Sequence, residues 1–128
     1  MKRNWDTIRE ILLKLEEFDP EISETGAITL RDFPPDKASE YSYHIQLLIE
    51  ANIIYGLISQ TMGVRIKDVI AYRLTWKGHE LLDAIHSDTI WNKTKKSFVK
   101  GGLSMTYELV KGVATDIAAS LLKSTISS

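Results

Sequence analysis

The chain contains no cysteine, and none of its apolar runs is as long as a helix that crosses a bilayer. The absence of cysteine excludes disulfide bonds and thiolate metal sites, and it agrees with a reducing compartment. The N-terminal segment starts basic but carries acids within its apolar pattern, unlike a signal peptide. We therefore expect a cytoplasmic protein without membrane-inserted segments.

The sequence also lacks the usual constellations of catalytic residues. It has no phosphate-binding Gly-rich loop, no nucleophile elbow and no paired carboxylates in an apolar setting. His79, Glu80, Asp83 and His86 come nearest to a metal-binding pattern, but Glu80 lies off the helix face that the two histidines share. Two histidines without a third ligand make a poor zinc site. We expect no enzymatic activity, no metal and no cofactor.

Neither sign of charge dominates, since the net charge is −1, but the two signs are unevenly distributed. Residues 1–60 carry 6 Lys/Arg and 11 Asp/Glu, whereas residues 61–128 carry 10 and 6. Attraction to a polyanion would therefore come from the second half. The alternative is that the two halves face each other, within one subunit or between two.

The most informative segment of the chain is residues 36–78. Its order of elements is typical of an α+β winged helix-turn-helix domain, in which the helix before the hairpin takes the recognition position. The usual partner of that fold is double-stranded DNA. The predicted elements are a helix (residues 36–51) capped by Asp36, two strands (53–58 and 69–74) with a turn around Met62 and Gly63, and a further helix capped by Thr75.

The flanking segments extend this domain on both sides. Asn4 is placed to cap a first helix, and residues 28–30 form a brief apolar strand that pairs with the later hairpin. We therefore predict a winged-helix domain at residues 1–87 and a C-terminal helical extension at residues 88–128. The extension contains two predicted helices, one that starts at Ser87-Asp88 and ends at Gly101-Gly102, and one from Leu103 to Lys123.

Four phrases of the sequence resemble a known family. They are MKRNWDTIREILLKLEE, YHIQLLIEANII, LTWKGHELLDAI and TIWNKTKK. The family consists of short bacterial and prophage proteins catalogued as a domain of unknown function, and its members look like relatives of the YjcQ winged-helix proteins. The resemblance implies a winged-helix fold and a mobile-element setting, but no activity. Asn52 stands where such proteins carry a glycine, and asparagine also tolerates the left-handed conformation.

The helix in the recognition position is poorly suited to reading DNA bases. Gln46 is its one good base-reading side chain, while Glu40 and Glu50 would meet phosphate. Tyr43 and Leu47 form a patch better suited to a protein contact than to DNA. The alternative is that this helix face is simply covered. His44 and Lys37 are expected at the flanks of the face.

Positive charge is concentrated elsewhere. Arg65 and Lys67 lie on the predicted wing, where Asp68 reduces their effect. The densest group of cations follows in the C-terminal extension, and phosphate is its natural anion. The alternative interpretation is the solvated face of an amphipathic helix. The members of this group are Lys93, Lys95, Lys96 and Lys100.

The last predicted helix carries an apolar stripe that is interrupted by charges. Its small residues, Gly112, Ala114 and Ala118, allow close approach of another helix. The helix either folds back onto its own domain or pairs with its copy in a second subunit, and we expect a homodimer. The stripe consists of Leu103, Val110, Val113, Ile117 and Leu121.

Two functions are compatible with these features. The first is a non-enzymatic accessory or regulatory protein of bacterial or prophage origin, with a DNA-binding transcriptional regulator as its most specific form. The second is a protein–protein interaction module that keeps the winged-helix fold without binding DNA. The first predicts duplex DNA as the partner, and the second predicts another protein.

Overall fold

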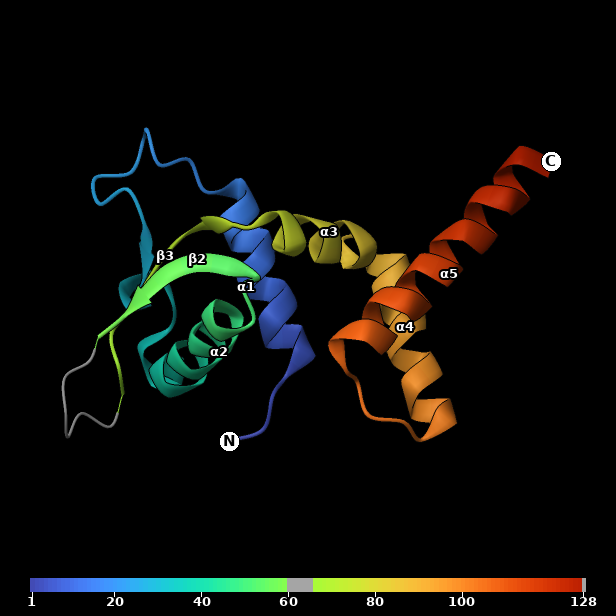
Figure 1. The fold of residues 1–128 in the computed structure, drawn as a ribbon, viewed down its shortest axis with the longest axis horizontal. Helices are drawn as coiled ribbons and strands as arrows, with labels where there is room; N and C mark the ends of the chain where they lie inside the picture. Colours follow the sequence, from blue (N-terminus) through green and yellow to red (C-terminus); the bar gives the residue numbers. More distant parts are fainter. Residues whose placement is uncertain (60–65, 128) are drawn as a thin grey trace. The chain divides into compact units, whose positions relative to one another are not determined.

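The computed structural model describes residues 1–59 and 66–127 (Figure 1). The turn predicted around Met62 and Gly63 lies outside these residues. The described part of the chain forms two compact units, residues 1–79 and residues 80–128. The elements in chain order are α1 (Trp5–Glu17), β1 (Ile28–Thr29), η1 (Leu30–Asp32), η2 (Pro35–Lys37), α2 (Ala38–Glu50), β2 (Ile54–Ile58), β3 (Val69–Leu74), α3 (Trp76–Ile85), α4 (Asp88–Gly101) and α5 (Tyr107–Ser127).

The first unit is built around a three-stranded antiparallel sheet with the order β1-β3-β2. Ile28 pairs with Ala71, and Ile54 pairs with Leu74, so the predicted brief strand does join the hairpin. Both α1 and α2 contact β3, and α2 also contacts β2. The architecture is α+β, as predicted, and is compatible with a winged-helix-like fold.

The core of the first unit arises from two amphipathic helices and one buried sheet face. On α1, Asn4 is the N-cap, and its side-chain oxygen accepts hydrogen bonds from the backbone N–H groups of Asp6 and Thr7. The three- and four-residue spacing of apolar side chains then turns one stripe of each helix toward the sheet. The most buried members are Ile8, Ile11, Leu12, Ile28, Ile45, Leu48, Ile54, Val69, Ala71 and Leu74.

The start of α2 differs from the prediction. Asp36 does not cap this helix, because Pro35–Lys37 form a 3-10 turn and α2 begins only at Ala38. The N-cap residue is Lys37, whose side chain makes no capping hydrogen bond. Proline at the start of the 3-10 turn has the φ angle that such a turn needs, so the chain enters the helix through this turn instead.

The end of α2 is a Schellman turn centred on Asn52. Asn52 has a φ of 59°, which confirms the left-handed conformation predicted for it. The N–H of Ile53 donates to the carbonyl of Leu48 (2.9 Å), and the N–H of Asn52 donates to that of Ile49 (3.1 Å). These two bonds satisfy carbonyls that the helix end would leave unpaired, and they direct the chain into β2.

The start of α3 packs directly on this turn. Thr75 caps α3 as predicted, since its hydroxyl oxygen accepts the N–H of Gly78 (3.0 Å). The same hydroxyl donates to the carbonyl of Asn52 (2.6 Å). Gly78 lies so close that an added Cβ would be 2.0 Å from the carbonyl oxygen of Ile53. The LTWKG phrase is therefore a packing device that joins α3 to the end of α2.

In the second unit, α4 and α5 pack against each other. Ser87 caps α4, and Gly102 ends it in the left-handed conformation (φ 65°), both as predicted. The last helix begins at Tyr107 rather than at Leu103, because Thr106 supplies its N-terminal cap by accepting the N–H of Leu109 (3.2 Å). Leu103 consequently lies outside the apolar stripe and is 62% exposed. Among the described residues, no helix has the length and apolar character needed to cross a membrane.

Candidate polyanion-binding site

The base-reading candidate Gln46 is half-buried and already engaged. Its side-chain amide donates to the hydroxyl of Ser42 (3.1 Å), which in turn donates to the backbone carbonyl of Lys67 (2.5 Å). This chain of hydrogen bonds ties α2 to the segment that enters β3. To use this N–H on a DNA base, Gln46 would have to release Ser42.

The carboxylate and imidazole groups of α2 also hold the fold together. Thr7 donates its hydroxyl to Glu40 (2.5 Å), so this acid is a link to α1. His44, expected at the flank of the exposed face, is instead buried. Its Nε2 accepts the N–H of Asn4 (2.8 Å), and its Nδ1 donates to the carbonyl of Glu40 (2.7 Å). Only a neutral imidazole with its proton on Nδ1 satisfies both bonds.

Tyr43 and Leu47, the predicted protein-contact pair, lie one turn apart on α2. Both side chains are half-buried. The Tyr43 ring meets the ring of His44 edge-on, with the centroids 5.6 Å apart. The pair thus presents part of its apolar surface to solvent, while Tyr43 also packs against a residue of the core.

The wing contributes one described cation. Lys67 has an exposed side chain, and its neighbour Asp68 is exposed as well. Arg65, the other predicted wing contact, lies outside the described residues. The described part of the wing therefore carries equal numbers of positive and negative side chains.

The strongest local concentration of positive charge lies on α4. Lys93, Lys96 and Lys100 are exposed and recur at three- and four-residue spacing, which places them along one side of the helix. We call these three residues the lysine row. Helix α4 holds four lysines and a single acid, Asp88, whereas α2 holds two acids and no lysine or arginine. Helix α2 is therefore acidic and helix α4 is basic.

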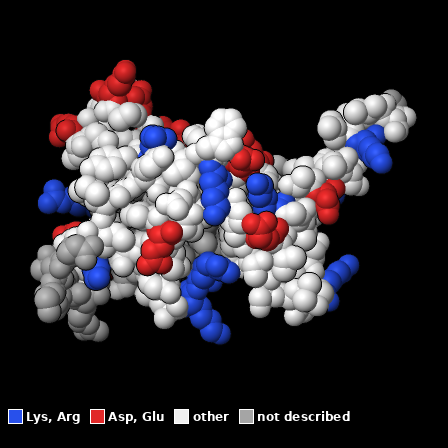
Figure 2. Space-filling model, in the orientation of Figure 1, with Lys and Arg blue, Asp and Glu red and all other residues white. Residues whose placement is uncertain are grey.

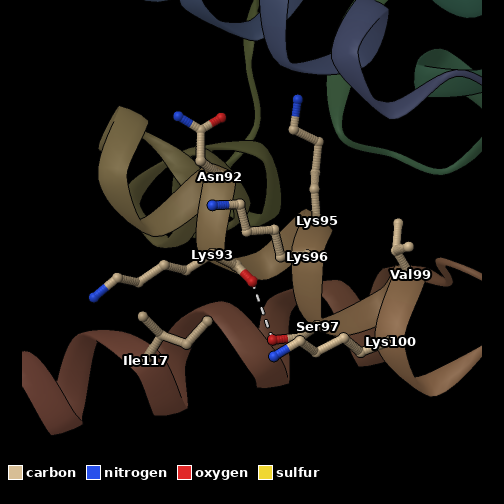
Figure 3. A pocket seen from close by; sticks show the side chains of 8 residues that line it. All are labelled: Asn92, Lys93, Lys95, Lys96, Ser97, Val99, Lys100 and Ile117. Atoms are coloured by element: carbon tan, nitrogen blue, oxygen red, sulfur yellow. Dashed lines mark hydrogen bonds between the residues drawn. The ribbon is translucent and has the colours of Figure 1, made fainter.

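Lys95 belongs to another side of α4. It is half-buried, and its ammonium group lies 5.6 Å from the centre of the Trp91 ring. Figure 3 shows Lys95 extending away from α5, whereas Lys93 and Lys100 extend on the α5 side. The predicted group of four lysines therefore consists of the lysine row and one lysine held over an aromatic ring, and all four line the same open groove.

An open groove of about 1030 Å³ runs beside the lysine row. Its wall combines the ammonium groups of the lysine row and of Lys95 with two aliphatic side chains, Val99 of α4 and Ile117 of α5 (Figure 3). Ser97 donates its hydroxyl to the carbonyl of Lys93 (3.0 Å), which fixes this side chain against the helix. The groove can thus hold an extended anion against cations on one helix.

The local electrostatics favour an external anion. Among the described residues of the second unit, no carboxylate forms an ion pair with a member of the lysine row. In contrast, Lys111 on α5 is paired with Glu80 at 3.6 Å. On the face drawn in Figure 2, the two signs of charge are interspersed, so no broad one-sign surface competes with this local feature there.

One surface was not anticipated from the sequence. Tyr55 and Leu57 of β2 and Tyr72 of β3 are exposed, and the guanidinium of Arg73 lies 4.0 Å from the centre of the Tyr55 ring. We call these four residues the sheet patch. Along β2, the exposed Tyr55 and Leu57 alternate with less exposed residues that begin with the buried Ile54. This two-residue period of a strand is the signal that could have indicated an outward apolar face.

The candidate metal ligands are not brought together. His79 and His86 are both exposed. In the part of the chain that the structure describes, no three His, Cys, Asp or Glu side chains form a group suited to a metal ion. The site that the structure does assemble is the groove beside the lysine row.

Comparisons with known proteins show that this chain is similar to a protein family and to a bacterial protein. A family model described as "Hypothetical protein (DUF2513)" matches residues 2–104. An "Uncharacterized protein" of Haemophilus influenzae (strain ATCC 51907 / DSM 11121 / KW20 / Rd) is 38% identical over 122 residues, which cover 95% of this chain and 99% of that protein. No solved structure matches the chain. The range matched by the family model includes the lysine row and ends before α5.

Proposed function

The chain belongs to the DUF2513 family, and we propose that it is a non-enzymatic accessory or regulatory protein that binds the phosphates of duplex DNA. The observation that carries the proposal is the lysine row, three exposed ammonium groups on one side of α4 beside an open groove. Phosphate contacts of this kind supply most of the affinity of sequence-independent DNA binding.

A winged-helix scaffold is part of the same proposal. It is supported by the order of elements and by the position of β1 beside β3, with α2 preceding the β2–β3 hairpin. Two short 3-10 turns, η1 and η2, stand between β1 and α2. In this scaffold α2 takes the recognition position, but its acids and the engaged Gln46 favour backbone contacts by other elements.

The biological setting is inferred from resemblance. The similar Haemophilus protein supports a bacterial origin, and the resemblance to YjcQ-like proteins suggests a prophage. We propose a cytoplasmic location on the same basis, since duplex DNA is found there. Phage genes flanking the coding sequence would support the prophage origin, whereas a setting of conserved housekeeping genes would contradict it.

The DNA proposal predicts a strong dependence on salt. Binding of a fluorescent duplex, followed by anisotropy, should weaken steeply between about 50 and about 200 mM salt. Replacing Lys93 and Lys96 by Gln removes two phosphate contacts. The slope of log affinity against log salt should therefore fall by about 2, and affinity at low salt should fall at least about tenfold.

The matched control removes the same charge from residues that do not line the groove. Lys2→Gln with Lys37→Gln removes two exposed lysines from the first unit, and this variant should bind almost as the unchanged protein does. Absence of duplex binding at low salt would contradict the proposal. So would equal losses in the two double variants, because net charge rather than the lysine row would then determine affinity.

A second candidate function is protein–protein interaction. The exposed sheet patch favours it, because aromatic residues and arginine dominate the energetics of protein interfaces. Tyr43 and Leu47 provide a second, less exposed surface on α2. The two surfaces belong to different elements and can be tested separately.

This candidate is tested by comparing two double variants. If the sheet patch is the contact, Tyr55→Ala with Leu57→Ala should remove a partner found by pull-down, while Tyr43→Ala with Leu47→Ala should retain it. The partner is then purified and its affinity measured by calorimetry, where a loss of about tenfold or more is expected. Unchanged affinity in both variants would exclude both surfaces.

A further inference from the structure

The C-terminal part of α5 is a helix without cover from the described residues of its own unit. Val110 and Ala114, near its start, are fully buried. In contrast, every residue from 119 to 127 is exposed, and Leu122 and Ile126 are 62% and 75% exposed. Figure 1 shows this part of α5 continuing past α4.

Such a helical segment has little stability in water on its own. A short helix is marginal in water, and most helical stability in proteins comes from burying an apolar face. Residues 119–127 keep three large aliphatic side chains exposed, those of Leu121, Leu122 and Ile126, while remaining helical. A partner that covers this face would offset the cost of ordering the helix.

The outward face of α5 has a specific pattern of charge and size. It includes one acid, Asp116, and one base, Lys123, two helical turns apart. Between them lie the small residues Ala119 and Ser120. A shallow hollow of about 440 Å³ lies on this face, lined by Asp116, Ala119, Ser120, Leu122, Lys123 and Ile126.

We propose that this face binds the same face of a second copy of the chain, with the two α5 helices antiparallel. If the two-fold axis passes between Ala119 and Ser120, Asp116 of each copy faces Lys123 of the other. The pairing is self-complementary, as an interface of this symmetry requires. The small residues lie at the crossing point, where they allow the helices to approach closely, and Leu122 and Ile126 flank it.

The charge pattern favours a second copy over other occupants. Asp116 and Lys123 are about 10 Å apart along their own helix, too far to pair within one chain. A face that carries both signs in equal number gains little from a polyanion or from an acidic membrane surface. One pair of short helical faces is small for a stable interface, so we expect a weak dimer that depends on concentration. This inference is independent of DNA binding.

The charges can be exchanged to test the pairing. Asp116→Lys places Lys opposite Lys, and Lys123→Asp places Asp opposite Asp, so each variant alone should dimerise at least about tenfold more weakly in sedimentation equilibrium. An equimolar mixture of the two variants should recover the affinity of the unchanged protein. In the mixed dimer, both lysines of one copy face aspartates of the other, so two ion pairs form again. Asp83→Lys, an equal charge change outside α5, should have no effect.

The apolar residues give a second readout. Leu122→Ser with Ile126→Ser should abolish dimerisation, and amide exchange at residues 119–127 should slow with concentration only in the unchanged protein. A protein that stays monomeric at all concentrations would overturn the proposal. A dimer whose affinity is unchanged by the charge reversals would overturn it as well. So would a mixture of the two charge variants that does not regain the affinity of the unchanged protein.

Discussion

At the scale of single residues, polar side chains of α2 hold the first unit together. Tyr41 stacks on Phe33 with ring centroids 4.2 Å apart, and its hydroxyl donates to Glu10 on α1 (2.7 Å). His44 accepts the backbone N–H of Asn4 and so fixes the start of α1. In the described part of the chain, no buried side-chain nitrogen or oxygen lacks a hydrogen-bond partner. A buried polar group that is left unpaired costs about 1–3 kcal/mol, so these contacts specify how α1 and α2 pack.

Tyr41 should titrate at unusually high pH. Burial, the hydrogen bond to Glu10 and the nearby carboxylates of Glu10 and Glu40 raise the pKa of Tyr41 to about 12. An unfolded tyrosine loses its proton near pH 10. The stability that this group contributes is therefore fully present below about pH 10 and is lost as the pH rises toward 12.

The measurement is an absorbance titration of tyrosinate together with denaturation at each pH. Tyr41→Phe keeps the ring but removes the proton, so the latest step of the titration should disappear. The decline in stability between pH 10 and pH 12 should become shallower in this variant. An unchanged titration in Tyr41→Phe would show that Tyr41 is not the tyrosine with the raised pKa.

At the scale of elements, the decisive contact is between the start of α3 and the turn that ends α2. Asn52 in the left-handed conformation directs the chain into β2, and Thr75 binds the carbonyl of Asn52 while it caps α3. The absence of a side chain at Gly78 lets the two backbones meet. Each of these residues has a role that depends on the other two.

Gly78→Ala should therefore be strongly destabilising. The added Cβ would be 2.0 Å from a backbone oxygen, so either the helix or the turn must move. Overpacking of this kind costs about 1–3 kcal/mol, and more where backbone is involved. The free energy of unfolding is measured by urea denaturation, at low protein concentration.

Gly112→Ala is the matched control for this substitution. Gly112 lies within α5, and an added Cβ would meet nothing within 4 Å. Because alanine is favoured over glycine in a helix by about 1 kcal/mol, the control should be neutral or stabilising. Equal losses of stability in the two variants would contradict the role assigned to Gly78.

At the scale of the whole molecule, the functional surfaces fall on different elements. The acidic helix α2 belongs to the first unit, whereas the lysine row and the exposed part of α5 belong to the second. The uneven distribution of charge along the sequence does not follow the division into units, because residues 1–79 carry 10 Lys/Arg and 12 Asp/Glu and residues 80–128 carry 6 and 5. The two proposals can therefore fail or succeed independently, since the groove and the dimer face use different residues.

Most elements were predictable because local chemistry determines them. The caps at Asn4, Thr75 and Ser87 and the left-handed Asn52 follow from side chains that bond to the adjacent backbone or tolerate its conformation. The start of α2 was less predictable, because a 3-10 turn after two prolines competes with the cap expected at Asp36. The start of the last helix was misplaced for a similar reason, since Thr106 caps it and Leu103 stays outside.

The sequence by itself therefore determined the order of the elements, most of their caps and the location of positive charge on α4. Only the tertiary structure decided which side chains remain available. His44 is buried and bonded to Asn4, Ser42 is bonded to the carbonyl of Lys67, and the sheet patch faces solvent. The physical reason is the separation along the chain between the residues that interact. Periodicity and capping depend on residues within a turn or two of one another, whereas availability depends on what residues far apart in the chain place next to each side chain.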